Sequence, residues 1–278
     1  MKPAAFDYQR ADTADVALAA LAELGGDARI LAGGQSLMAV LNMRLAQPKR
    51  LVDISRSAAL AEVRIDAGWL HIGAAATQAS VEWRPRLAQE LPLLALAFPH
   101  ISHFQIRNRG TVAGSIAHAD PSAELPLCLL ALQGEVVLRS AKRRRTVKAA
   151  DFFTGMLTTA RSDDEMIEAV RLPLARPGTG HGFAEFSMRH GDFAVCAVAA
   201  VADAKRLRIA VGGVADQAVA RDFAVVAGGA LDDALNEFAW SLDIRDEPQA
   251  SAVLRRRLVR ELGRRAAEQA LATRSHPV

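Results

Sequence analysis

Residues 31–37 read LAGGQSL, which places paired glycines between an apolar run and a segment with helical spacing. Glycine has no Cβ, so it adopts positive φ readily and lets the backbone approach a ligand closely. Successive N–H groups at such a turn, followed by a helix N-terminus, favour a phosphate group. The first hypothesis is a cofactor that carries a pyrophosphate. A ligand-free turn between a strand and a helix is the alternative, because Gly-Gly mainly signals a turn.

The segments on either side of this stretch predict a small α/β unit of about 55 residues. Asp12-Thr13 precedes apolar residues at helical spacing that end at Gly25-Gly26, so a capped helix is expected there. Strands are expected at 29–31 and 50–54, with a helix at 37–45 between them. Further on, 61–65 and 69–73 predict a hairpin. Helical signals resume from Thr77, and 87–98 predicts a buried helix with Pro92 near its start.

A second glycine-rich stretch, RNRGTVAGSIAHADPSAELP, occupies residues 107–126. Gly110 and Gly114 allow close backbone approach, and the hydroxyls of Thr111 and Ser115 add hydrogen-bond donors. Two such loops within about 150 residues favour a bound polar ligand over two unrelated turns.

Acidic residues follow in the same stretch. Asp120 or Glu124 could accept hydrogen bonds from ribose hydroxyls. A helix is expected after this stretch, at 127–132. The alternative role for the acidic residues is structural: a turn followed by an N-capped helix, with Ser122 as the cap and Glu124 in the first turn.

Composition excludes several function classes. The 278 residues carry 34 Lys+Arg against 31 Asp+Glu, and this scattered net charge of +3 gives no clustered basic face for nucleic acid. The one basic run, 142–145, predicts a solvated hairpin turn, with a docking patch for an acidic partner as the alternative. Cys128 and Cys196 stand alone in apolar runs, so buried reduced thiols are expected. We expect no secretory signal, no membrane span and, by default, a cytoplasmic location.

The ordered segments identify a family. AGGQSL at 32–37, RLAQPKRLVDIS at 44–55 and the stretch at 107–126 together resemble the FAD-binding medium subunit of the molybdenum hydroxylases, the family of carbon monoxide dehydrogenase and xanthine dehydrogenase. The resemblance continues in the same order through three further segments, at 151–155, 164–173 and 189–194.

The resemblance implies an α+β fold. Residues 1–175 would form a two-subdomain FAD-binding domain of the PCMH (vanillyl-alcohol oxidase-like) type, with subdomains at about 1–56 and 57–175. After a linker near 175–180, residues 181–278 would form a smaller α+β C-terminal domain with an antiparallel sheet and helices. The residues agree, because apolar strand-like runs at 183–211 precede helical periodicity at 251–271.

The resemblance also implies non-covalently bound FAD, its pyrophosphate held by 32–36 and 111–115. Glu124 would lie near the ribose and adenine, Ile167 against the flavin and Phe193 close to the isoalloxazine. For Ile101, Ile167 and Phe193, plain core packing is the alternative. The cofactor-binding residues expected are Ala32, Gly33, Gly34, Gln35, Ser36, Leu37, Ile101, Thr111, Ala113, Gly114, Ser115, Asp120, Glu124, Ile167 and Phe193.

The sequence departs from the family pattern at three places. Val112-Ala113-Gly114 stands where many relatives have Ile-Gly-Gly, so a methyl group replaces hydrogen at the middle position. Glu185 occupies a position that is often Lys, which puts a cationic contact to the flavin in doubt. Phe193 lacks the hydroxyl of the Tyr found in some relatives.

The activity implied is that of an oxidoreductase subunit. FAD would collect electrons from a small subunit with [2Fe–2S] clusters and pass them to an external acceptor. A large molybdopterin subunit would oxidise the substrate, and the assembly implied is a dimer of heterotrimers. No catalytic residue or metal site is expected in this chain, whose cysteines are too few for a cluster. Two alternatives remain, a self-sufficient flavoprotein oxidase or reductase and a flavin-free scaffold subunit.

Overall fold

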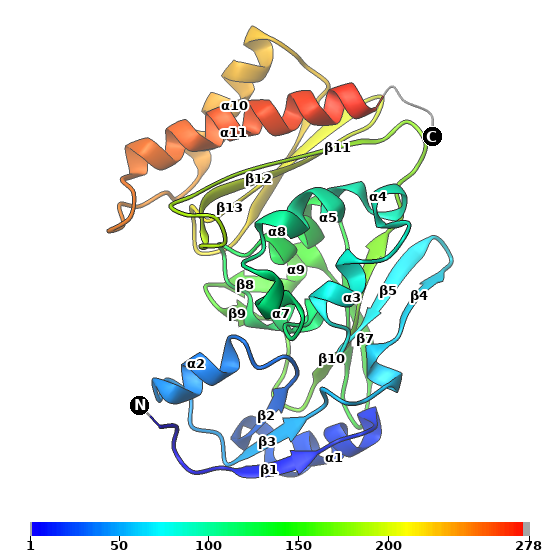
Figure 1. Ribbon diagram of the computed structural model, residues 1–278. Coiled ribbons are helices and arrows are strands. Elements are labelled where there is room, and N and C mark those ends of the chain that lie inside the picture. Colours follow the sequence, from blue (N-terminus) through cyan, green and yellow to red (C-terminus); the bar gives the residue numbers. More distant parts are fainter. Residues whose placement is uncertain (1, 275–278) are drawn as a thin grey trace.

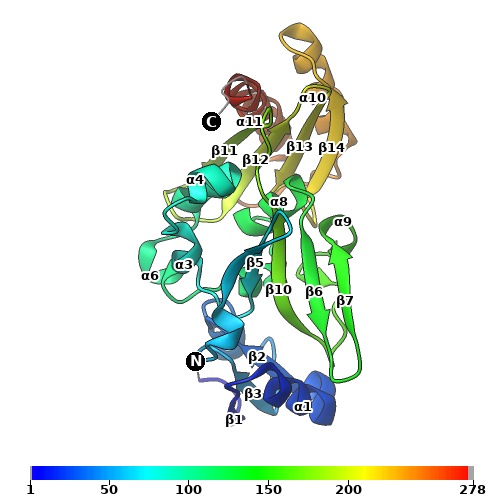
Figure 2. The same cartoon turned by 90° about the vertical axis from the view of Figure 1, so that its right-hand side faces the viewer.

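Three sheets, each built from one continuous part of the chain, organise the molecule (Figure 1). The computed structural model describes residues 2–274. Figures 1 and 2 show the three parts following one another along an elongated molecule, from the N-terminal sheet to the two helices that cover the C-terminal sheet. The boundaries expected at 1–56, 57–175 and 181–278 stay a prediction.

The N-terminal part is a parallel three-stranded sheet of order β1-β3-β2. Its elements are β1 Asp7–Arg10, α1 Ala14–Leu24, the 3-10 helix η1 Gly25–Asp27, β2 Ala28–Leu31, α2 Leu37–Asn42 and β3 Arg50–Asp53. Thr13 caps α1 as expected, because its hydroxyl oxygen accepts the Val16 N–H at 3.3 Å. β1 was not predicted, since DYQR shows no apolar alternation. α2 ends three residues earlier than expected, shortly before Arg44, whose φ is +57°.

The middle part is an antiparallel five-stranded sheet of order β4-β5-β10-β6-β7. Its strands are β4 Val63–Asp66, β5 Trp69–Gly73, β6 Glu135–Arg139, β7 Arg144–Lys148 and β10 Met166–Pro173, with a small ribbon of β8 Phe153–Gly155 and β9 Thr158–Thr159. Its helices are η2 Ala59–Ala61, α3 Gln78–Glu82, α4 Leu87–Glu90, α5 Pro92–Ala97, η3 Phe98–His100, α6 Phe104–Arg107, α7 Val112–His118, α8 Glu124–Ala131 and α9 Ala149–Phe152. The expected hairpin is confirmed as β4 and β5.

Two expectations for the middle part were wrong in detail. Residues 87–98 are split into α4 and α5, because Pro92 has no N–H to continue a helix and instead starts the second one. The helix expected at 127–132 begins at Glu124 and is buried along its whole length. Ser122 does not cap it. Ala123 precedes the helix without a side-chain cap, and the Ser122 N–H donates to Asp120 Oδ1 at 2.9 Å.

The C-terminal part is an antiparallel sheet of order β11-β12-β13-β14, covered by two helices. Its elements are β11 Gly180–Ser187, β12 Ala194–Ala202, β13 Arg206–Gly212, β14 Val219–Ala224, α10 Gly229–Ser241 and α11 Ala252–Thr273. Ser251 caps α11, its hydroxyl accepting the Leu254 N–H at 3.3 Å. β14 and α10 were not predicted.

Burial on both faces explains the continuous apolar run in β12. Helix α11 packs on one face of this sheet and α8 on the other, so alternation with polar residues is absent. Cys128 and Cys196 are both free and buried, as expected. Among the described residues, no helix combines the length and apolar character needed to cross a bilayer.

Candidate functional site

One cleft of about 610 Å³ lies where the N-terminal part meets the middle part, and the segment after β11 reaches its edge. This volume is in the usual range of small-molecule sites. Segments far apart in sequence form its walls, from 28–46, 101–124, 157–167 and 191–193. All fifteen residues proposed from the sequence line it: Ala32, Gly33, Gly34, Gln35, Ser36, Leu37, Ile101, Thr111, Ala113, Gly114, Ser115, Asp120, Glu124, Ile167 and Phe193.

The two glycine-containing segments touch each other at this cleft. A Cβ built on Gly33 would lie 2.2 Å from the Arg109 carbonyl oxygen and 2.6 Å from Gly110 Cα. Such distances leave room for hydrogen only, so glycine at 33 allows the close approach of the two backbones. Gly34 adopts φ +75°, a conformation that L side chains rarely take.

Several backbone donors at the contact remain free. Among residues 2–274, the N–H groups of Gly33, Gly34, Gln35, Ser36 and Ala113 have no hydrogen-bond acceptor. Unpaired backbone donors inside a protein cost free energy unless a ligand or water satisfies them. Their gathering from two segments fits an anion with several oxygens, such as the pyrophosphate of FAD.

The second segment is a helix start and not an open loop. Thr111 caps α7, and its hydroxyl oxygen accepts the Gly114 N–H at 2.9 Å. A Cβ on Gly114 would lie 2.7 Å from that hydroxyl oxygen. Glycine at 114 therefore preserves the cap, and the cap leaves the Ala113 N–H directed outward from the helix end.

Glu124 is a buried carboxyl in the cleft wall, with 6% of its surface exposed. Burial, with a smaller contribution from the charge of Asp120, raises the pKa of Glu124 to about 7 against an opposing backbone hydrogen bond. A carboxyl group whose pKa is near 7 is partly protonated at neutral pH, and its protonated form can donate a hydrogen bond as well as accept one. The side chain thus suits a polar ligand with hydroxyl groups.

The three apolar positions differ in their surroundings. Ile101 and Ile167 belong to the core and also line the cleft. Core packing is therefore confirmed for both, and a contact with the flavin stays a prediction. Phe193 lines the cleft but is 64% exposed, so core packing is wrong for this side chain. An exposed aromatic ring at a cleft edge can pack on a planar ligand.

Glu185, the position often occupied by Lys in the family, lies on β11 outside the lining residues. Its side chain is buried, and its Oε1 is 3.9 Å from His100 Nδ1. Burial, and then the charge of Glu124, raise the pKa of Glu185 to about 8. Its Oε2 has no hydrogen-bond partner among the described residues.

Other lining residues were missed by the sequence reasoning. They include Arg29, Gln78, Leu157, Arg161, Glu165 and Asp192. Gln78 Oε1 is buried without a partner, so an amide acceptor is also free there. No local motif marks these residues, because their common feature is proximity in space.

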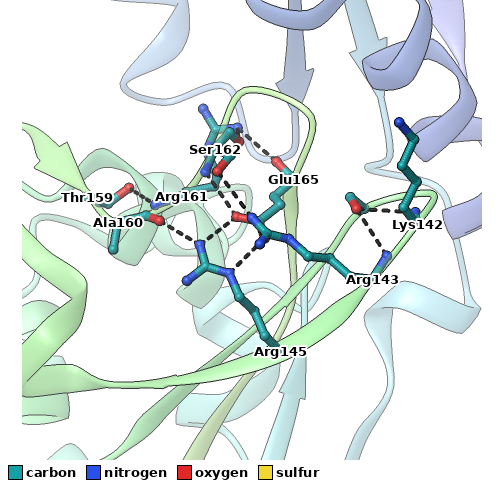
Figure 3. Close-up of polar contacts among 9 residues, drawn as sticks. Lys142, Arg143, Arg145, Thr159, Ala160, Arg161, Ser162 and Glu165 are labelled. Atoms are coloured by element: carbon teal, nitrogen blue, oxygen red, sulfur yellow. Dashed lines mark hydrogen bonds and ion pairs between the residues drawn. The ribbon is translucent and has the colours of Figure 1, made fainter.

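The basic run at 142–145 spans the end of the hairpin turn between β6 and β7 and the first two residues of β7, so a hairpin is confirmed, but the run is not simply solvated. Arg143 and Arg145 contact Glu165 (Figure 3). Arg144 donates to Glu168 at 2.5 Å. The acidic run that follows in sequence, 163–165, was the available signal for such pairing.

Comparisons with known proteins agree with this geometry. Residues 4–175 match the family described as the FAD binding domain in molybdopterin dehydrogenase. The nicotine 6-hydroxylase medium subunit of Paenarthrobacter nicotinovorans is 41% identical over 86% of this chain and 88% of its own length. The carbon monoxide dehydrogenase medium chain of Hydrogenophaga pseudoflava is 35% identical over 80% of this chain and 79% of its own. A solved chain of CO dehydrogenase from Oligotropha carboxidovorans superimposes with a TM-score of 0.93 at 30% identity, covering 98% of this chain and 100% of that one.

Proposed function

Because the chain belongs to the FAD-binding medium subunits of the molybdenum hydroxylase family, we propose that it passes electrons from the [2Fe–2S] clusters of a partner subunit to an external acceptor. It is the FAD-binding subunit of an oxidoreductase complex. The observation that best supports the proposed role is the gathering of free backbone N–H groups from 32–36 and 111–115 at one cleft.

In this proposal each group of cleft residues has a separate task. The N–H groups of Gly33 to Ser36 and of Ala113 bind the pyrophosphate. Glu124 binds the ribose and adenine end. Ile101, Ile167 and Phe193 pack on the flavin and keep water from it, and Asp120 supports the turn before α8.

The redox chemistry belongs to the cofactor. When bound, FAD supplies an isoalloxazine ring that accepts and releases electrons, while the protein provides binding, orientation and electrostatics. This chain holds the ring through apolar contacts at Ile167 and Phe193. Between residues 2 and 274 no group of His, Cys, Asp and Glu side chains is arranged to hold a metal ion.

We assign the remaining cofactors to partners. A small subunit would carry the [2Fe–2S] clusters and a large one the molybdenum cofactor, where substrate is oxidised, in a dimer of heterotrimers. Support comes from the medium-subunit names of the relatives and from the two buried cysteines, which are too few to ligate a cluster. A cytoplasmic location is part of the same proposal.

Reconstitution of the purified full chain tests the proposal. The flavin is removed, and FAD or FMN is added back before gel filtration and visible spectroscopy. FAD should be retained at one per chain, and FMN should be lost, because FMN lacks the pyrophosphate that the free N–H groups bind. Absence of flavin bands with FAD would favour a scaffold, and substrate oxidation by the chain alone would favour an oxidase.

Electron passage is tested in the assembled complex. Rapid mixing with substrate should reduce the clusters and then the flavin. Reduction of the clusters without any bleaching of the flavin band would contradict the proposed route.

A further inference from the structure

The 160–165 loop, which joins β9 to β10, forms one wall of the cleft through Arg161 and Glu165. It contains consecutive acidic residues and would be expected to extend into solvent. Figure 3 instead shows it folded back over the hairpin of β6 and β7, with Arg143 and Arg145 pointing toward Glu165.

Glu165 is the centre of this arrangement, and its side chain is fully buried. Arg145 donates from Nε to Oε1 and from Nη2 to Oε2, both at 2.8 Å. The Ser162 N–H donates to Oε2 at 2.9 Å, and Arg143 Nη2 lies 3.1 Å from Oε1. Bidentate pairing with Arg fixes orientation as well as charge. The hydrogen bond from Arg145 lowers the pKa of Glu165 to about 2, so the carboxylate stays ionised.

Arginine side chains also hold the backbone of the loop. Arg145 Nη2 donates to the Ala160 carbonyl oxygen at 2.7 Å. Arg161 Nη1 donates at 2.8 Å to the carbonyl oxygens of both Ser162 and Glu165. The loop is therefore fixed from both ends, and its conformation depends on the charge at Glu165.

The same loop meets the N-terminal part of the molecule. A Cβ on Gly26 would lie 3.3 Å from Asp163 Oδ2, and Met166 packs in the core cluster that contains α1 and β2 residues. Arg161 is close enough to Arg29, also a lining residue, for the Arg29 charge to lower the pKa of Arg161, after the larger effect of burial. The loop thus connects the hairpin to the part that carries the 32–36 segment.

We propose that Glu165 is a positioning residue for FAD, which through Arg143 and Arg145 holds the 160–165 loop against the N-terminal part and so sets the width of the cleft. The inference rests on the proposed function. Glu165 need not touch the cofactor in this role, because it acts through Arg161 and the neighbouring Ile167, which line the same wall.

Removal of the carboxylate charge should release the loop. A buried pair that loses one partner leaves an uncompensated charge, which is strongly unfavourable. In Glu165→Gln the guanidinium of Arg145 would have to move toward water, and its bond to the Ala160 carbonyl oxygen would move with it. The wall would then open at Arg161.

Glu168 provides a matched control. It lies on β10, three residues after Glu165, and also binds two arginines, with Oε1 3.2 Å from Arg139 Nη1 and Oε2 2.5 Å from Arg144 Nε. It is not among the residues that line the cleft. Glu168→Gln therefore removes two ion pairs of the same hairpin, which are more exposed than those of Glu165, and leaves the contacts of the 160–165 loop in place. Arg139 keeps its own ion pair with Asp15 of α1 in this variant.

The experiment titrates FAD into the flavin-free full chain of the wild type, Glu165→Gln, Arg143→Gln and Glu168→Gln, and records the visible circular dichroism of the bound flavin. Glu165→Gln should weaken FAD binding by about tenfold or more and alter the flavin spectrum at saturation. Arg143→Gln should give a change of the same kind but smaller, because this arginine is more than half exposed. Its exposure also makes it the safer variant for folding. Glu168→Gln should match the wild type.

Two outcomes would overturn the inference. One is wild-type FAD affinity and an unchanged flavin spectrum in both Glu165→Gln and Arg143→Gln. The other is an equal loss in Glu168→Gln, which would show a general effect of lost ion pairs. Failure of the wild-type chain to bind FAD would instead refute the proposed function itself, so the two failures are distinguishable.

Discussion

Replacement of Gly33 by alanine tests the contact on which the cleft depends. The added Cβ would lie 2.2 Å from the Arg109 carbonyl oxygen and 2.6 Å from Gly110 Cα, whereas ordinary contact begins near 3.4 Å. The two segments must separate by on the order of 1 Å, and because both obstacles are backbone atoms no side-chain rotation relieves the clash. Overpacking of this kind costs about 1–3 kcal/mol.

The change should therefore affect both stability and ligand binding. We expect a lower denaturation midpoint for the flavin-free chain and at least tenfold weaker FAD binding, since the free N–H groups of 33–36 and of Ala113 no longer face one ligand. A larger side chain, as in Gly33→Val, would disturb folding as well, so a variant that simply loses FAD while staying fully folded is not expected at this position.

Gly155→Ala is the matched control, because a Cβ there meets nothing within 4 Å. The assay combines urea unfolding with FAD titration monitored by flavin fluorescence. If Gly33→Ala unfolds at the same urea concentration as the wild type and binds FAD equally well, the close approach of the two backbones is refuted.

Three further predictions concern single side chains. Phe193→Ala should weaken FAD binding with little change in the stability of the flavin-free chain, since this ring is 64% exposed. Phe104 is 61% exposed and lies outside the cleft lining, so Phe104→Ala should change neither FAD binding nor stability. Equal FAD affinities of the two variants would contradict a flavin contact of Phe193. Burial raises the pKa of Glu185 in the folded chain to about 8 from an ordinary 4.5, so between these pH values the folded chain keeps a proton that the unfolded chain releases. The free energy of unfolding should therefore fall as pH rises from 5 to 8, and urea unfolding at these two pH values should show a smaller fall in Glu185→Gln than in the wild type. An identical fall in both would refute the burial of this carboxyl. Gly114→Ala should cost about 0.5–2 kcal/mol by displacing the Thr111 cap, and combination with Thr111→Ala should add little, as a double-mutant cycle would reveal.

Much of the fold was predictable because local patterns and tertiary packing agree. The helix capped by Thr13, the hairpin of β4 and β5 and the final helix after Ser251 all follow from caps, turns and periodicity. The resemblance supplied the α+β class and the FAD-binding domain type, and the match to CO dehydrogenase confirms both. Short elements without a periodic signal, such as β1 and β14, depend on strand pairing with distant residues and could not be read locally.

Part of the candidate site could likewise be predicted from local patterns, and part of it could not. Glycine pairs and their neighbours carry a local signal, so the segments at 32–36 and 111–115 could be proposed in advance. Ser122 was given the wrong role, because the residue that precedes the helix is Ala123 and Ser122 belongs to the turn before it. Arg161 and Glu165 were missed, since their importance comes from partners on a different hairpin.

The sequence by itself determined that two glycine-containing turns and a familiar order of segments belong to an FAD-binding subunit. Backbone freedom at glycine is a property of the residue, so it is visible without a fold. Only the tertiary structure decided that the residues of both turns with free N–H groups line one cleft and that Arg143 and Arg145 bind a buried carboxylate. Both features depend on contacts between residues that are distant in sequence, and such residues come close together only when the chain folds.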